Sequence, residues 1–191
     1  MMAGKNLLCV GLISPEVTEN LMTKYWLEVE NQIARLETSF SKVRRLYHES
    51  NYLDGEAGLK NVQRINEKAF QLIKNRSDKG AKLEALEDKE TLLEISDCQL
   101  FLGIEFSSRE VQDKTSKLVP EIMQVYEKAL QRRRTYIPKK ISESLASGET
   151  GMLLMREEER MRIQFPSEIN VILVRPLVLG EIEKWERDHQ G

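Results

Sequence analysis

The stretch LLCVGLI at residues 7–13 decides the fold, because it is an unbroken apolar run that Ser14 and Pro15 follow directly. A short continuous run of this kind is typical of a strand buried on both faces of a sheet. Ser14 can cap a helix, and Pro15 suits the first helical position, where no N–H is needed. The stretch therefore predicts a buried strand at residues 7–13 that leads straight into a helix.

A long amphipathic helix is predicted next. Apolar side chains recur at spacings of three and four, at Val17, Leu21, Met22, Tyr25, Val29, Ile33 and Leu36. Such spacing places one apolar stripe on a helix of about two dozen residues, which is long for a small domain. Residues 43–48, VRRLYH, are predicted as the second strand, which completes a βαβ unit if it runs parallel to the first.

The rest of the chain divides into a helical middle and a strand-rich end. Residues 56–147 show mainly helical spacing, and Pro120 and Pro138 are predicted to kink or break the helices there. Three more strands are predicted at residues 151–156, 160–165 and 169–174, the first two joined by a charged hairpin. A short amphipathic helix is expected to close the chain.

The fold class that follows is α/β or α+β. We expect a single domain over residues 1–191, in which the long N-terminal helix and the helical middle flank a mixed sheet of about five strands. The stretch at residues 56–147 can form a helical subdomain inserted into the sheet domain.

Composition excludes several classes of protein. Lys and Arg number 29 against 31 for Asp and Glu, and both signs are mixed along the chain, so no basic half or acidic tail indicates a partner. The two cysteines, Cys9 and Cys98, lie inside apolar runs, which favours reduced thiols and a cytoplasmic location. No apolar run approaches the ~20 residues that cross a bilayer, so we expect no membrane association.

The motifs of common cofactors and nucleophiles are missing from the sequence. Gly11 is the lone glycine of the first strand, no glycine cluster of a P-loop or a dinucleotide site follows it, and no G-x-S-x-G motif is present. Glu90, Glu94 and Asp97 share a helix face, but carboxylates at these spacings are typical of a solvated surface. We therefore expect no cofactor and no metal, and the sequence favours a role other than catalysis.

One pair of residues is a candidate for acid–base chemistry. His48 and Glu49 adjoin in a region ordered enough to hold their geometry, and the pair would serve a hydrolase or a lyase. Adjacent residues of a strand point to opposite faces, which argues against their acting on the same atom.

A basic cluster is a candidate for binding phosphate groups or nucleic acid. It consists of Arg132, Arg133, Arg134, Tyr136, Lys139 and Lys140. Cationic side chains with an aromatic among them are what a phosphate-contacting surface needs. Three consecutive arginines fan around a helix, however, and a chain of net charge −2 lacks the wide positive field of most nucleic-acid binders.

Three functions follow from these observations. The first is a non-catalytic interaction or regulatory protein of the cytoplasm that forms a homodimer through its long amphipathic helices, the first helix among them. The second is an RNA- or nucleotide-associated protein that uses residues 132–140. The third is a hydrolase or lyase with its acid–base site at His48 and Glu49.

Overall fold

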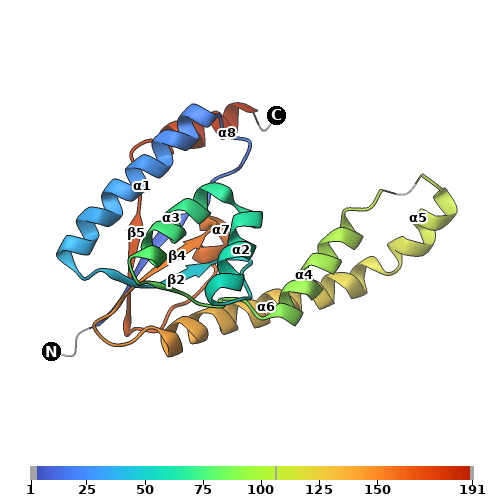
Figure 1. Ribbon diagram of the computed structural model, residues 1–191. Helices are drawn as coiled ribbons and strands as arrows, with labels where there is room; N and C mark the ends of the chain where they lie inside the picture. Colours follow the sequence, from blue (N-terminus) through green and yellow to red (C-terminus); the bar gives the residue numbers. More distant parts are fainter. Residues whose placement is uncertain (1–3, 106, 190–191) are drawn as a thin grey trace.

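A parallel five-stranded sheet forms the centre of the molecule in the computed structural model, which describes residues 4–105 and 107–189 (Figure 1). The strands are β1 (Lys5–Gly11), β2 (Val43–His48), β3 (Lys82–Leu83), β4 (Thr150–Met155) and β5 (Ile169–Val174). Their order across the sheet is β3-β2-β4-β1-β5, and every neighbouring pair is parallel. The first strand of the sequence therefore has a neighbour on each side, β4 and β5.

Helices cover both faces of the sheet. They are α1 (Glu19–Ser39), α2 (Gly55–Ile65), α3 (Glu67–Asp78), α4 (Lys89–Leu102), α5 (Arg109–Ser116), α6 (Val119–Ser144), α7 (Glu157–Met161) and α8 (Leu179–His189). The core on one face contains buried side chains of α1, α2, α3 and α8, and the core on the other contains those of the last turns of α6. No helix within residues 4–105 and 107–189 has the length and apolar character that a membrane span requires.

The unbroken apolar run of β1 serves both cores. Leu8 and Val10 pack on the face that carries α1, whereas Leu7 and Cys9 pack on the face that carries α6. All four side chains are buried, because successive residues of a strand point to opposite faces and both faces are covered.

The predicted α/β class is confirmed, and two details of the predicted sheet are wrong. The sheet is wholly parallel rather than mixed, and residues 160–165 form no strand: α7 and an irregular segment occupy that part of the chain. Since β1 lies between β4 and β5, the chain must cross over β1 rather than return in a hairpin. Ile163 and Phe165 pack on the α6 side of the sheet during this crossing, which explains the apolar alternation that suggested a strand.

The helical middle of the chain divides into two parts. Helices α2 and α3 pack against the sheet core, whereas α4, α5 and the first half of α6 project away from the sheet (Figure 1). We call the projecting part, from α4 to Arg132 of α6, the arm. Helix α6 begins with Pro120 in its first turn and continues through Pro138 to Ser144, so Pro138 does not end the helix. One continuous helix therefore joins the arm to the underside of the sheet.

A close backbone approach at Gly58 of α2 gives a first prediction. A Cβ at this position would clash with the carbonyl oxygen of Leu53 and lie 3.0 Å from Cδ2 of Leu83. We expect Gly58→Ala to lower the free energy of unfolding in urea by about 1–3 kcal/mol, although alanine normally favours helices. Gly180→Ala in α8, where a Cβ meets nothing within 4 Å, is the control and should be neutral or slightly stabilising. Equal losses for both variants would contradict the steric explanation.

Candidate functional site

The carboxyl ends of β1 and β4 mark a point where the chain leaves the sheet in opposite directions. After β1 it passes through α1 on one face towards β2, and after β4 it passes through α7 on the other face towards β5. Parallel α/β sheets bind their ligands in the crevice beyond such a switch point. The topology alone therefore indicates where a site should lie.

A cavity of about 520 Å³ occupies this position. Its wall contains segments at the carboxyl ends of four strands: residues 11–15 after β1, 48–50 at the end of β2, 156–158 after β4 and 174–175 at the end of β5. Helix α8 contributes Ile182, Glu183 and Glu186. The cavity thus collects side chains from segments that are far apart in the sequence.

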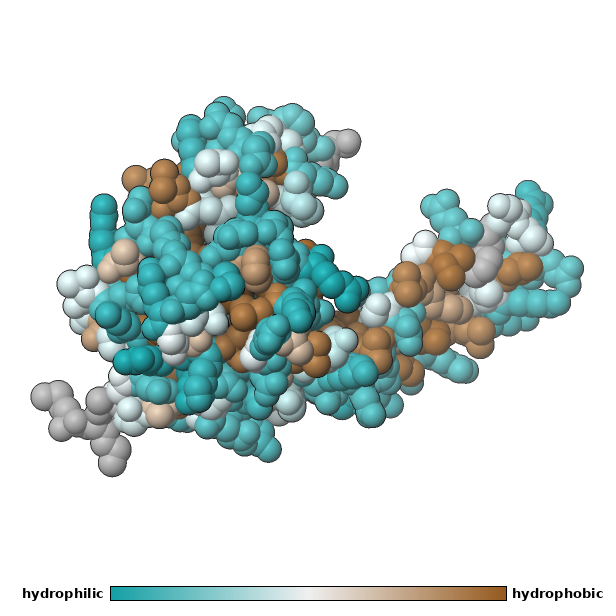
Figure 2. Space-filling model, viewed as in Figure 1, coloured by the Kyte–Doolittle hydropathy of each residue, from teal (hydrophilic) through white to brown (hydrophobic). Residues whose placement is uncertain are grey.

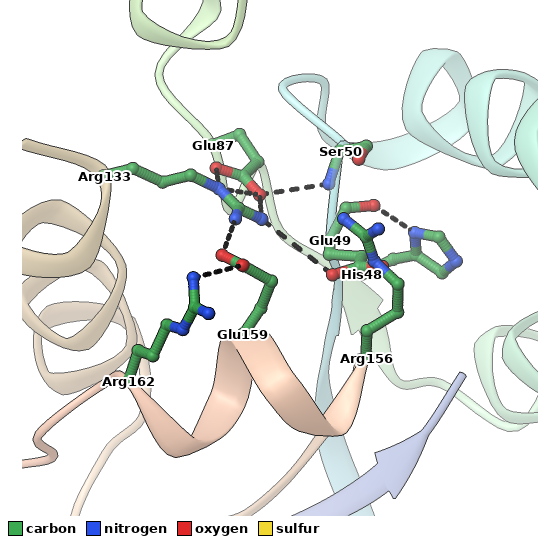
Figure 3. Close-up of polar contacts among 8 residues, drawn as sticks. All are labelled: His48, Glu49, Ser50, Glu87, Arg133, Arg156, Glu159 and Arg162. Atoms are coloured by element: carbon green, nitrogen blue, oxygen red, sulfur yellow. Dashed lines mark hydrogen bonds and ion pairs between the residues drawn. The ribbon is translucent and has the colours of Figure 1, made fainter. Parts of the chain in front are cut away.

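His48, the last residue of β2, is a neutral hydrogen-bond acceptor in the wall of the cavity. The side chain is fully buried, and Nδ1 donates a hydrogen bond to the backbone carbonyl oxygen of Glu49 (Figure 3). Burial lowers the pKa of His48 to about 4, so the imidazole is uncharged near neutral pH. With the proton on Nδ1, Nε2 presents a lone pair, and no described residue donates to it.

Glu49 follows His48 directly and is also buried in the wall. Its Oε1 accepts a hydrogen bond of 2.9 Å from Nε of Arg156, while its Oε2 has no hydrogen-bond donor among the described residues. Nη2 of Arg133 lies 3.9 Å from Oε2. Burial raises the pKa of Glu49 above its usual value, although both arginines oppose the shift. Such a carboxyl group is suited to gaining and losing a proton.

A buried ion-pair network supports Glu49 from behind, and Arg133 of α6 is its centre (Figure 3). Arg133 donates to both carboxylate oxygens of Glu87, at 2.6 to 3.0 Å, and to Oε2 of Glu159 at 2.8 Å. Burial lowers the pKa of Arg133, but the carboxylates around it outweigh burial and the net shift is upward. The network holds α6, α7 and the end of β2 together.

The residue after Glu49 has an unusual backbone conformation. Ser50 has a φ of 63°, the only positive φ among the described residues other than glycine. Non-glycine residues adopt this region at some cost, and such positions are common at functional sites. The Ser50 N–H donates a 3.0 Å hydrogen bond to Oε1 of Glu87, so the Arg133 network also fixes this turn.

Three arginines line the cavity together with acidic partners. Arg160 and Arg175 both form ion pairs with Glu157, and Arg156 binds Glu49. The side chains of Arg156 and Arg175 are 59% and 60% exposed, whereas that of Arg160 is mostly buried. Two exposed cationic groups, each paired with a carboxylate, therefore line the cavity.

The cavity also contains a cysteine. Cys9 lines the cavity, but burial raises the pKa of its thiol to about 12, so the reactive thiolate is not formed near neutral pH. Residues 4–105 and 107–189 contain no group of three or more His, Cys, Asp or Glu side chains placed to hold a metal ion.

Comparison with protein-family models, with curated proteins and with solved structures finds no match to this chain. The strongest features of the cavity are the two buried acceptor atoms, Nε2 of His48 and Oε2 of Glu49.

The structure places the two candidate sites of the sequence differently. His48 and Glu49 lie in the wall of one cavity, because β2 ends at His48 and Glu49 already belongs to the turn that follows. The basic cluster is divided: Arg133 lies in the buried network, Arg132 pairs with Glu94, and Lys139 is 3.8 Å from Glu143. Binding of nucleic acid by this cluster stays a prediction.

Sequence reasoning missed the residues that complete the site. Arg156 and Arg175 each stand at the carboxyl end of a predicted strand, which is a usable signal once the sheet is known to be parallel. Glu87 and Glu159 carry no such signal. They join Arg133 only because α6 passes behind the end of β2 and meets α7 there.

Proposed function

We propose that the protein binds a small hydroxyl-bearing molecule in the cavity at the carboxyl edge of its sheet. The observation that carries this proposal is the pair of buried acceptors, Nε2 of His48 and Oε2 of Glu49, in the wall of the cavity. Buried polar atoms normally have partners, so we expect a ligand that donates hydrogen bonds to pair with at least one of these two acceptors. Hydroxyl groups provide such donors without placing a further charge beside Glu49.

The exposed arginines favour a ligand with an anionic end. Arg156 and Arg175 lie at the mouth of the cavity and can turn towards a phosphate or carboxylate group. A sugar phosphate or a nucleotide combines such a group with several hydroxyls. This class of molecule fits both parts of the site.

Glu49 is the group that we propose for proton transfer. A carboxyl group of raised pKa can protonate a leaving oxygen or accept a proton from water or carbon, which is the step that hydrolases and lyases require. Arg156 covers Oε1 in the structure and is largely exposed, so its movement would open Glu49 to the ligand. His48 positions the ligand as an acceptor, since burial keeps its imidazole neutral.

Titration of the labelled protein with ribose 5-phosphate and with AMP, followed by NMR of the backbone amides, tests the proposal. We expect the largest shifts at residues 48–50 and 156–158. Glu49→Gln, which keeps the shape of the side chain, should weaken binding about tenfold or more, as expected for the loss of a charge-assisted hydrogen bond. Glu143→Gln, a surface change on α6, is the matched control. If neither probe shifts the cavity residues, or if both variants bind as wild type does, the proposal fails.

A second candidate function is association with another protein chain through the arm. Helix α5 buries none of its described side chains, and α4 buries only Ile95 and Cys98. The apolar stripe of α1, by contrast, lies largely within the subunit, with Met22, Tyr25 and Val29 buried. The arm is therefore the better candidate for a contact between chains.

We also propose that the protein works in the cytoplasm. Cys9 and Cys98 are both free and both buried, and they lie on different parts of the molecule. Unpaired thiols of this kind are typical of a reducing compartment. Mass spectrometry of the protein alkylated directly in cells would reveal any oxidised fraction, which this proposal does not allow.

A further inference from the structure

The arm exposes an unusual amount of apolar surface. Fifteen large apolar side chains are exposed in the described part of the chain, and eight of them belong to the arm. These eight are Leu93, Leu100, Ile104, Val111, Leu118, Val119, Met123 and Val125, each 37–67% exposed. Apolar residues gather along the arm in Figure 2 as well. Concentrations of this kind mark surfaces that are covered in the working assembly.

A groove with an acidic rim runs between α4 and α6. Leu93 and Phe101 from α4 and Val125 from α6 form part of its apolar lining, and Glu90 and Asp97 stand at its edge. Neither carboxylate forms an ion pair with a described residue, and both side chains are exposed. The groove therefore offers a ligand apolar contact surrounded by uncompensated negative charge.

A basic surface follows the groove along α6. Lys128, Arg132 and Lys139 surround Tyr136, whose ring is partly exposed. Lys128 forms no ion pair with any described residue, and the only partner of Lys139 is Glu143 at 3.8 Å. This surface carries the positive charge that the acidic groove lacks.

The two surfaces share one side of α6. Val125 in the groove is seven residues before Arg132 and eleven before Tyr136, spacings that fall on one helical face. A two-fold axis between them would set the groove of each copy on the basic surface of the other, with both contacts formed at once. We propose that the arm binds a second copy of this chain in this antiparallel arrangement, in which the groove lies on the arm and the basic surface extends beyond the arm along α6 to Lys139. This inference rests on the arm being an interaction surface.

The available area agrees with a dimer. Full burial of an aliphatic side chain removes roughly 60–120 Å² of apolar surface from water. Eight side chains that are about half exposed thus offer roughly 200–450 Å² per copy. A standard interface buries about 800 Å² on each partner, a little over half of it apolar. The apolar surface of one arm therefore reaches what one such interface requires at the upper end of this range.

Variants with reversed charges on the groove or on the basic surface test the arrangement. Sedimentation velocity measures whether each variant is a monomer or a dimer. The wild-type chain is expected to be a dimer. Glu90→Lys with Asp97→Lys makes the groove basic, and Lys128→Glu with Lys139→Glu makes the basic surface acidic. Each double variant should be a monomer, because like charges then meet at both contacts. An equimolar mixture of the two double variants should restore the dimer, since each contact again joins opposite charges.

The outcomes separate the proposals. A wild-type chain that stays monomeric at high concentration overturns the second copy as partner and leaves the arm free for another protein. A wild-type dimer that both double variants retain overturns the pairing of the groove with the basic surface, because the contact then lies elsewhere. All four substituted side chains are exposed, so circular dichroism should show unchanged folding. Monomeric variants whose mixture does not dimerise would refute the antiparallel pairing.

Discussion

Replacing Arg133 by methionine is expected to lower the free energy of unfolding by about 3–5 kcal/mol, the largest effect of any single change considered for this protein. The side chain is 7% exposed, and its removal leaves Glu87 buried without the guanidinium that binds both of its oxygens. A buried charge whose partner has been removed costs more than the intact pair contributes, since neither water nor another cation compensates it. Urea denaturation of the purified variant measures the loss.

Arg132→Met is the matched control, because it removes the neighbouring arginine from the surface. Arg132 pairs with Glu94, but both side chains are well exposed, so we expect a loss of no more than about 1 kcal/mol. Arg133→Lys keeps a positive charge without the planar fork and should fall between the two, which gives a measurement even if Arg133→Met does not fold. Similar stabilities for Arg133→Met and Arg132→Met would show that the buried network contributes little.

Acid is expected to destabilise the protein through His48. The pKa of this residue is about 4 in the folded chain and about 6.5 when unfolded, so between these values the unfolded chain binds one more proton. The contribution of the neutral His48 to the free energy of unfolding is fully present above about pH 6.5 and is lost progressively as the pH falls to about 4. The shift corresponds to about 3 kcal/mol.

The His48 effect can be separated from that of its neighbours by its slope. Glu49 acts in the opposite direction, because its raised pKa lets the folded chain hold a proton that the unfolded chain has released. The negative charge of Glu87 also faces the imidazole and favours its protonation. His48→Asn should flatten the pH dependence of the unfolding free energy between pH 6.5 and 4, whereas the exposed His189→Asn should not. A wild-type profile without this slope would mean that burial does not lower the pKa of His48 in the folded chain.

The first strand and the long first helix could be predicted because their signals are local. The run at residues 7–13 is apolar throughout, and Met22, Tyr25 and Val29 repeat at helical spacing, so each pattern specifies its own element. The direction of the strands is not local. Nothing within residues 160–165 reveals that β1 already separates β4 from β5, and so the alternation of this segment wrongly predicts a strand.

Only part of the candidate site could be predicted from the sequence, again because only that part has a local signal. His48 and Glu49 could be found because histidine and carboxylate adjoin, but their common cavity depends on where β2 ends. The members of the charge network are far apart in the sequence. Arg133 is 46 residues from Glu87 and 26 residues from Glu159. A cluster of three arginines indicates a surface, and only the packing of α6 shows that the middle one is inside.

Arg133 connects two parts of the molecule, the helix α6 and the charge network behind the cavity. It belongs to the helix that carries the arm, and its Nη2 lies 3.9 Å from the Glu49 oxygen that has no hydrogen-bond donor among the described residues. A rotation of α6 would therefore change the field at the cavity, and a new charge in the cavity would pull on α6. Coupling between two sites through a shared group is reciprocal. If ligand binding in the cavity changes the affinity of the arm for its partner, then binding of that partner changes the affinity of the cavity for its ligand by the same factor.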